Sequence, residues 1–331
     1  MFLNQRIKCF LELGERLKSL SEDRMVELSK MAGNQNTWFT PRSVKSSIHG
    51  IGKFLKKEVL EDWVGKYDFE KTQEKKVGVI AAGNIPLVGF HDAMCVLIAG
   101  HILNLKMSSD DGVLMQFVLD ELIDIDPRLK DRINIVDRLN DSDAFIATGS
   151  DNSARYFKYY FKDKPNIIRA NRTSLAVLDG AETEEDYINL GKDVFEYFGL
   201  GCRNVSKLYV PVGYKFDSLL DVLEEYSWVG DHHKYRNNYD YNKSIYLVNN
   251  EPHLDNGFLL LRKSDRLVSP ISVLYFEEYS SQKDFELKLS TFEFKIQCIV
   301  GKNYLPFGEA QKPQVWDYAD GVDTMKFLSS F

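Results

Sequence analysis

One short stretch of this chain combines a potential nucleophile with a loose backbone, and its sequence is Gly199-Leu200-Gly201-Cys202-Arg203-Asn204. Residues 184–198 are expected to form a helix that ends at glycine, and residues 206–211 are expected to begin a strand. Cys202 is therefore placed at a helix-to-strand junction, where flanking glycines let the backbone turn tightly and approach a ligand. We interpret Cys202 as a thiol nucleophile. The alternative, from this window alone, is a cysteine that fits a crowded turn.

The other three cysteines are widely separated in the sequence: Cys9, Cys95 and Cys298. This spacing argues against a disulfide framework and against a zinc cluster, and it fits a reducing compartment. Each lies in a segment expected to be helical or apolar, so we expect structural roles, with Cys95 and Cys298 buried. Asp231-His232-His233 lacks the further ligand spacing of a metal site, so no metal is expected.

Composition limits the classes of partner. The chain has 331 residues, 44% of them hydrophobic, which is enough for about two domains of ~150 residues. Its formal net charge of −7 lacks the basic excess of a nucleic-acid-binding surface. The sequence has no leader pattern and no apolar run of about 20 residues, so we expect no membrane segment and a cytoplasmic location.

The N-terminal part predicts helices. Apolar residues recur at helical spacing from Leu3 to Leu20, Ser21 caps a second helix that is expected to end at Gly33, and Thr40-Pro41 begins a third that runs toward Leu60. Residues 71–76 are mostly charged and predict a solvated connector.

From residue 77 onward, apolar strands alternate with helices. The expected strands are 77–81, 102–106, 133–136, 144–148 and 166–169, and the expected helices are 88–99, 114–123 and 153–161. This alternation predicts parallel crossovers in an open α/β sheet, which suits a dinucleotide. The usual Gly-x-Gly-x-x-Gly turn is missing after the first strand. A second α/β unit is expected beyond Cys202, with strands at 208–210, 244–248, 258–261, 273–276 and 296–300 and helices at 216–226 and 282–292.

An ordered series of motifs resembles the aldehyde dehydrogenase superfamily, and within it the LuxC-type acyl-CoA reductase branch. Residues 79–86, Val-Ile-Ala-Ala-Gly-Asn-Ile-Pro, are similar to the strand that ends in an asparagine before a proline. Residues 105–109 resemble the Leu-Lys-Pro-Ser strand end, and residues 145–150 resemble the Phe-Thr-Gly-Ser turn. Residues 199–202, followed by Ser206-Lys207, resemble the nucleophile loop. Residues 269–270 and 306–309 match family positions more loosely.

The resemblance implies a role for each matched residue. Cys202 would be the nucleophile, and the Asn84 side chain together with the Cys202 backbone N–H would form the oxyanion hole. A turn role is the alternative for Asn84. Lys106 would bind the adenosine ribose or a 2′-phosphate, unless it is only a solvated strand end. Gly149 and Ser150 would meet the pyrophosphate, unless Ser150 is an ordinary helix cap. The implied cofactor-binding set is Ala81, Ala82, Lys106, Ser108, Thr148, Gly149 and Ser150.

The departures from the family pattern matter as much as the matches. Hydrolytic aldehyde dehydrogenases carry a glutamate that activates the deacylating water, and the alignment places Arg169 there. Without that base, hydride or CoA should resolve the acyl-enzyme. Near Ser269-Pro270 the family often has a glutamate that holds the nicotinamide ribose, whereas this chain offers Arg266 and Asp265. The chain is also shorter than full-length members, so reduced oligomerisation elements are expected, and a homodimer stays open.

Together these features predict two α/β domains of the aldehyde dehydrogenase type, a Rossmann-like cofactor domain and a catalytic domain, after an N-terminal helical segment. The expected boundaries are 1–75 for the helical segment, 76–175 for the dinucleotide-binding domain, 176–305 for the catalytic domain and 306–331 for a tail. The leading hypothesis is an acyl-CoA reductase that uses NADPH or NADH and acts on an acyl-CoA or another acyl thioester. The alternatives are a hydrolysing aldehyde dehydrogenase and a non-catalytic member that binds nucleotide or acyl chains.

Overall fold

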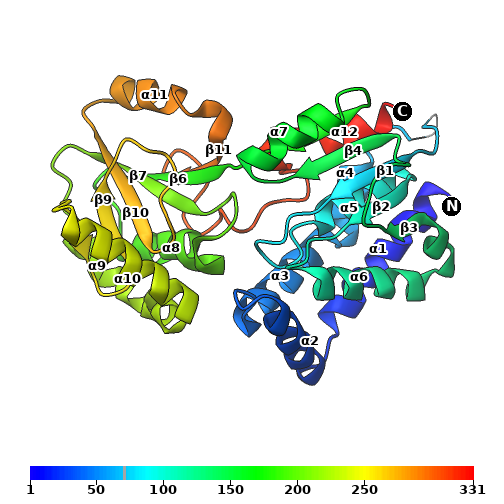
Figure 1. The fold of residues 1–331 in the computed structure, drawn as a ribbon, viewed down its shortest axis with the longest axis horizontal. Coiled ribbons are helices and arrows are strands. Elements are labelled where there is room, and N and C mark those ends of the chain that lie inside the picture. The colour runs from blue at the N-terminus through cyan, green and yellow to red at the C-terminus, as the bar shows by residue number, and fades with distance from the viewer. Residues whose placement is uncertain (70–71) are drawn as a thin grey trace. The chain divides into compact units, whose positions relative to one another are not determined.

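The computed structural model describes residues 1–69 and 72–331 and divides them into two units (Figure 1). Unit 1 consists of Met1–Asn171 and Gln314–Phe331, and unit 2 consists of Arg172–Pro313. The four segments expected from the sequence stay predictions of functional domains. Lys71, the first residue of the expected connector, lies outside the described residues.

Unit 1 begins with four helices, α1 (Leu3–Lys18), α2 (Glu22–Gln35), α3 (Pro41–Phe54) and α4 (Lys57–Val64). The caps predicted from the sequence are confirmed, because Ser21 accepts a hydrogen bond from the Arg24 N–H and Thr40 accepts one from the Ser43 N–H. The predicted end at Gly33 is wrong. A Cβ there would lie 3.3 Å from the Phe39 carbonyl oxygen, so this glycine serves close packing and α2 continues past it. The expected third helix is two helices, since the chain leaves the helical conformation between α3 and α4.

The described residues of unit 1 also form a five-stranded parallel sheet in the order β3-β2-β1-β4-β5. Its strands are β1 (Lys76–Ile80), β2 (Ile102–Lys106), β3 (Ile133–Ile135), β4 (Ala144–Thr148) and β5 (Asn166–Arg169). The longer connections are α5 (Phe90–Ala99), α6 (Gly112–Ile125) and α7 (Asp151–Tyr160), and a short 3-10 helix (Pro127–Arg132) precedes β3. The predicted alternation of strands and helices is confirmed.

The two faces of this sheet differ in character. Val77 pairs with Leu103, and these side chains join one apolar core with α5, α6 and the N-terminal helices. Figure 1 shows α5 and α1 beside β1 and β2. On the other face Gly78 pairs with Asn104 and Phe145, and the Phe145 ring stacks at 3.9 Å on Phe161, directly after α7. The core face therefore supports the strands while the opposite face carries polar groups.

The end of the chain completes the core of unit 1. A short 3-10 helix (Ala319–Gly321) leads to α12 (Thr324–Ser329), which packs on α5. The Trp63 indole N–H donates to the Tyr318 hydroxyl at 2.7 Å, and Met325 and Leu328 are fully buried.

Unit 2 is built on a six-stranded sheet in the order β11-β6-β7-β10-β9-β8, parallel except for the β8–β9 pair. Its strands are β6 (Thr173–Val177), β7 (Val205–Pro211), β8 (Leu254–Asp255), β9 (Leu260–Lys263), β10 (Val273–Tyr279) and β11 (Ile296–Gly301). Its α-helices are α8 (Glu184–Phe195), α9 (Asp217–Leu223), α10 (His233–Val248) and α11 (Gln282–Ser290). Short 3-10 helices lie at Glu196–Gly199, Glu224–Asp231 and Glu293–Lys295.

Two secondary-structure predictions in unit 2 are wrong. The helix expected over residues 184–198 ends at Phe195, because Tyr197 and Phe198 adopt the left-handed conformation. The second concerns an expected strand. Residues 244–248 were expected to form a strand because they are rich in β-branched, aromatic and apolar side chains. They are the last turns of α10, in which Tyr235, Tyr239, Asn242 and Tyr246 are buried. These four recur at helical spacing, and Tyr239 and Tyr246 pack with Leu260 and Val273, so tertiary burial overrides the local preference.

Candidate active site

The chain around Cys202 has an unusual backbone. After α8, Tyr197 (φ 52°) and Phe198 (φ 58°) both adopt the left-handed conformation, followed by Gly199 (φ 79°) and Gly201 (φ 99°). For the two non-glycine residues this conformation costs roughly 1–2 kcal/mol each. The buried Phe198 ring, which contacts the rings of Trp228, His232 and Tyr235, holds the turn in place. The loop therefore stores strain next to the predicted nucleophile.

Hydrogen bonds from β6 fix the cysteine turn. Cys202 is half-buried, and its carbonyl oxygen accepts a hydrogen bond from the Ser174 hydroxyl at 3.1 Å. The carbonyl of Asn204 accepts from the Ser174 N–H at 2.9 Å and from the Thr173 hydroxyl at 3.1 Å. The predicted helix-to-strand junction is confirmed, and β6 holds both Cys202 itself and Asn204 on its C-terminal side.

The other cysteines occupy different environments. Cys9 and Cys95 are buried, and burial raises the pKa of the Cys9 thiol to about 11 and that of Cys95 well above its usual value. The prediction that Cys298 is buried is wrong. It lies half-buried in edge strand β11, where its sulfur is 3.0 Å from the Ser174 hydroxyl, because only one neighbouring strand covers β11.

A second buried group supports the cysteine region, and the sequence interpretation missed it. Asp193 lies on the apolar side of α8, and its carboxylate accepts from the Gly308 N–H (2.6 Å) and the Ala310 N–H (2.9 Å). Burial raises its pKa to about 6 despite these two donors. The Ala310 carbonyl in turn accepts from Arg203 at 3.3 Å. A lone aspartate among buried residues of a predicted helix was the signal that could have identified it.

Ser206 and Lys207, which follow the cysteine turn, anchor another loop of unit 2. Lys207 is fully buried and donates to the Glu277 carboxylate (2.6 Å) and the Asp265 carbonyl (3.1 Å). The Ser206 hydroxyl donates to the Leu267 carbonyl at 3.1 Å. The segment with Asp265 and Arg266, where the family glutamate was expected, is thus tied to β7.

In unit 1, all the predicted cofactor residues lie at the carboxyl ends of three neighbouring strands. Ala81 and Ala82 follow β1, Lys106 ends β2 with Ser108 two residues on, and Thr148 ends β4. The chain leaves β1 toward β2 on one side, whereas β4 lies on its other side. In open α/β sheets this switch point is where ligands bind.

The turns at this sheet edge are tight. A Cβ on Gly83 would lie 2.3 Å from the Ser108 hydroxyl, so the loops after β1 and β2 touch. A Cβ on Gly149 would lie 2.8 Å from the Ser153 Cβ, so only glycine fits between β4 and α7. Ser150 caps α7 by accepting from the Ser153 N–H at 3.2 Å. Ser150 is therefore the N-cap of α7, and the N-terminus of this helix lies at the carboxyl end of β4.

Asn84 lies in the turn after β1, with an exposed side chain. Two neighbours hold its loop by hydrogen bonds: the Asn36 amide donates to the Gly83 carbonyl (3.4 Å) and the Ser47 hydroxyl donates to the Pro86 carbonyl (2.6 Å). Asn84 belongs to unit 1 and Cys202 to unit 2. Their shared role in an oxyanion hole stays a prediction.

Arg169 ends β5 and is only 4% exposed. Its guanidinium pairs with the Asp92 carboxylate at 2.5 Å and donates to the Thr324 hydroxyl at 2.8 Å. Asp92 lies in the first turn of α5 and is itself buried, so this ion pair is inside the core of unit 1. The resemblance to aldehyde dehydrogenases implies a general base at this position in the hydrolytic members, and this chain has a buried cation in an ion pair there.

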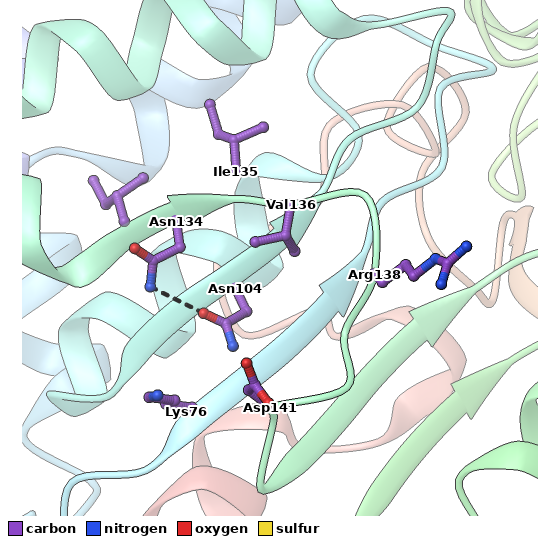
Figure 2. Close-up of a pocket in the computed structure, with 8 residues that line it drawn as sticks. Lys76, Asn104, Asn134, Ile135, Val136, Arg138 and Asp141 are labelled. Carbon is purple, nitrogen blue, oxygen red and sulfur yellow. Dashed lines mark hydrogen bonds between the residues drawn. The ribbon is translucent and has the colours of Figure 1, made fainter.

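A cavity of about 430 Å³ lies on the polar face of the unit 1 sheet (Figure 2). The Asn134 amide donates to the Asn104 side-chain oxygen at 3.0 Å, and Arg138 and Asp141 come from the loop before β4. Its lining contains none of the residues predicted to bind cofactor.

In the described part of the chain, no group of three or more His, Cys, Asp or Glu side chains is placed to hold a metal ion. Every described helix is too short or too polar to span a membrane.

Comparison with solved structures defines the fold. The chain is similar to an aldehyde dehydrogenase from Mycobacterium tuberculosis complexed with NAD⁺, with a TM-score of 0.64, 14% identity, and coverage of 86% of this chain and 70% of that one. It is also similar to aldehyde dehydrogenase 21 from Physcomitrella patens in complex with succinate (TM-score 0.65, 13% identity, coverage 92% and 74%). The Bacillus cereus aldehyde dehydrogenase in its NAD⁺ complex gives a TM-score of 0.63 at 13% identity, with coverage of 91% and 72%. The fold is thus that of the aldehyde dehydrogenases.

The sequence profile of the LuxC acyl-CoA reductases matches residues 17–217, which is more than half of the chain. The chain therefore belongs to the acyl-CoA reductase (LuxC) family, and the resemblance inferred from the ordered motifs is confirmed. Among curated protein sequences, no significant match is found.

Proposed function

We propose that this protein reduces an acyl-CoA, or another acyl thioester, to an aldehyde through an acyl-enzyme on Cys202. The observation that carries the proposal is the half-buried cysteine on a strained, β6-anchored turn in a chain of the acyl-CoA reductase family. Strained backbone at a nucleophile is typical of active sites, where it preorganises the reacting group.

The proposed reaction has two steps. The Cys202 thiolate attacks the thioester carbonyl, the C–S bond to CoA breaks, and CoA leaves as the thiol after taking up a proton. A bound NADH or NADPH would supply a hydride to the carbonyl carbon of the enzyme thioester. The bond from that carbon to the Cys202 sulfur then breaks, which releases the aldehyde and restores the Cys202 thiolate. In both steps charge develops on the carbonyl oxygen. The proposal assigns the Asn84 amide and the Cys202 N–H as donors to it, each worth about 3 kcal/mol.

Residues at the unit 1 sheet edge suit a dinucleotide. Ala81 and Ala82 after β1 have small side chains, and the tight Gly149 turn leads into the N-terminus of α7 at the switch point. We assign the seven predicted cofactor residues to NADH or NADPH there: Ala81, Ala82, Lys106, Ser108, Thr148, Gly149 and Ser150. Two of the similar solved structures are NAD⁺ complexes, which supports this assignment.

Product analysis tests the proposal. Incubation with acyl-CoAs of several chain lengths and NADH or NADPH should give aldehyde, free CoA and oxidised cofactor in equal amounts, and Cys202→Ala should abolish turnover. Arg169, buried in its pair with Asp92, cannot activate water, so little free acid is expected. Acid as the main product would favour the hydrolysing alternative, and turnover that survives in Cys202→Ala would refute the mechanism.

Two further parts of the proposal concern the whole protein. We place it in the cytoplasm, since its cysteines form no disulfides among themselves. We also propose that the protein forms a homodimer. Light scattering after gel filtration measures its molar mass and tests this proposal.

A further inference from the structure

A buried carboxyl group lies behind the Asn84 loop. Asp111 is at the N-cap position of α6, yet its side chain makes no capping hydrogen bond to its own helix. Aspartate at this position usually accepts from the N–H two or three residues on. Asp111 is instead 1% exposed, and its Oδ2 accepts from the Leu87 N–H at 2.7 Å. Its Oδ1 is buried and has no hydrogen-bond partner among the described residues. The carboxyl group therefore serves another segment at a cost to its own helix.

That segment contains a strained residue. Leu87 has φ 58°, which a leucine adopts only when its surroundings enforce it. The Leu87 side chain is buried and its carbonyl accepts from the Phe90 N–H at 3.0 Å, so the turn is the entry to α5. A hydrogen bond to the Leu87 N–H is well placed to enforce the left-handed conformation.

Three separate elements converge on this loop. Asn36 at the end of α2 binds Gly83, Ser47 on α3 binds Pro86, and Asp111 at the start of α6 binds Leu87. Asn84 and Ile85 lie between these anchored points, and the Asn84 side chain is exposed. Hydrogen bonds from three elements therefore hold the backbone on both sides of Asn84.

We infer that Asp111, assisted by Ser47, is a positioning residue that holds the loop bearing Asn84 in the geometry needed for its amide to act on the substrate. This inference rests on the proposed function for the role of Asn84, whereas the positioning of the loop stands on the hydrogen bonds alone.

The protonation state of Asp111 decides which variants are informative. Burial raises the pKa of this carboxyl to about 8, so it is mostly neutral at pH 7. Asp111→Asn keeps a neutral acceptor of the same shape. Asp111→Leu fills similar space without an acceptor and leaves the Leu87 N–H unpaired. The adjacent Asp110 is exposed and serves as the control.

Hydrogen exchange tests the positioning without any activity. The backbone amides of residues 83–85, 87 and 88 should exchange at least tenfold faster in Asp111→Leu and by a smaller factor in Ser47→Ala, whereas Asp111→Asn and Asp110→Ala should match the wild type. The strand β1 amides act as an internal reference for global stability. Unchanged exchange in both Asp111→Leu and Ser47→Ala would overturn the inference, and this arm is decisive even if the protein reduces no acyl-CoA.

Kinetics test the consequence for catalysis. Asp111→Leu should lower kcat for acyl-CoA reduction by about 10- to 100-fold with KM little changed, because small misplacement of a catalytic donor has effects of that size. Asp111→Asn should restore most of the activity. In an Asn84→Ala background, Asp111→Leu should cause no further loss, since the two residues act in series. Losses that multiply would show that Asp111 acts apart from Asn84 and would overturn the catalytic part. Should Asp111→Leu fail to fold, Ser47→Ala with the same Asn84→Ala background gives the same decision from a smaller effect.

Discussion

At the residue scale, the left-handed turn before Cys202 is the most specific feature of unit 2. Gly199 has φ 79°, and a Cβ there would meet only ordinary contacts at 3.5 Å or more, so a side chain fits but the backbone would be strained. Gly213 has nearly the same backbone (φ 80°) in open space after β7 and is not part of the cysteine turn. The two glycines form a matched pair for separating backbone strain from function.

We predict that Gly199→Ala and Gly213→Ala each lower the free energy of unfolding by about 1–2 kcal/mol. Only Gly199→Ala should also lower acyl-CoA turnover, by about tenfold or more, because it displaces the nucleophile. Chemical denaturation and steady-state kinetics measure the two effects. Equal turnover in both variants would show that the turn geometry has no part in the reaction.

Thiol reactivity is a second prediction at this scale. Iodoacetamide at neutral pH should label Cys202 while Cys9 and Cys95 stay slow, because burial raises the pKa of both. Cys298 is half-buried and has to be followed separately by peptide mapping. Protection of Cys202 in the folded protein, or uniform labelling of all four thiols, would argue against an open nucleophile.

Asp111 also predicts how stability depends on pH. Its pKa is raised to about 8 in the folded protein, so between pH 4 and 8 the folded chain binds a proton that the unfolded chain has released. This contribution to stability is complete at low pH and is lost as the pH rises through about 8, with a slope of up to ~1.4 kcal/mol per pH unit. The pKa of Asp193 is raised only to about 6, so its contribution to stability is lost as the pH rises through about 6. Above that pH, the pH dependence that these two carboxyl groups give to stability comes from Asp111.

Denaturation curves at pH 6 and pH 8 for the wild type and Asp111→Asn check this prediction. The wild type should lose more stability than the variant over this interval. Identical losses would mean that Asp111 is already ionised at pH 6.

At the scale of secondary-structure elements, Arg169 connects β5, α5 and α12 through Asp92 and Thr324. Removing one partner of a buried ion pair leaves an uncompensated charge and costs about 3–5 kcal/mol. We therefore predict that Arg169→Ala and Asp92→Ala each destabilise unit 1 by that amount. Lys45→Ala, which breaks an exposed pair with Glu22, should cost at most about 1 kcal/mol.

The ion pair between Arg169 and Asp92 also leads to a prediction about the reaction product. Arg169→Glu should not convert the enzyme into a hydrolase, because it places a second carboxylate against Asp92 in a buried site. Thermal unfolding should show strong destabilisation, and product analysis should show no rise in free acid. A stable, acid-forming variant would contradict this account of Arg169.

An element is predicted well from the sequence when its buried residues form a local apolar pattern, and poorly when their burial depends on distant parts of the chain. The strands around Val77 and Leu103 were predicted because buried parallel strands are continuous apolar runs. The helix around Tyr239 and Tyr246 was missed because its buried residues are tyrosines and an asparagine within a polar segment, and their burial depends on distant β9 and β10. The roles of Asp92, Asp111 and Asp193 depend on contacts between residues far apart in the sequence, and local patterns do not contain them.

At the scale of the whole molecule, family membership and fold agree with the order of the motifs along the chain. The candidate site residues were predicted mainly through the resemblance. The structure places Lys106 at the end of β2, Gly149 directly after β4 and Cys202 in the turn before β7, and their roles stay proposals. The sequence could not show how their loops are held, because the anchors come from helices α2, α3 and α6 for one loop and from β6 for the other.

The acyl-enzyme on Cys202 is the central claim, and intact-protein mass spectrometry with peptide mapping tests it most directly. Incubation with an acyl-CoA in the absence of NADH and NADPH should add the mass of one acyl group at Cys202, and addition of the reduced cofactor should remove it with release of one equivalent of aldehyde. The Cys202→Ala variant should acquire no adduct. An adduct on another cysteine, or aldehyde formation with no acyl group ever bound at Cys202, would contradict the account.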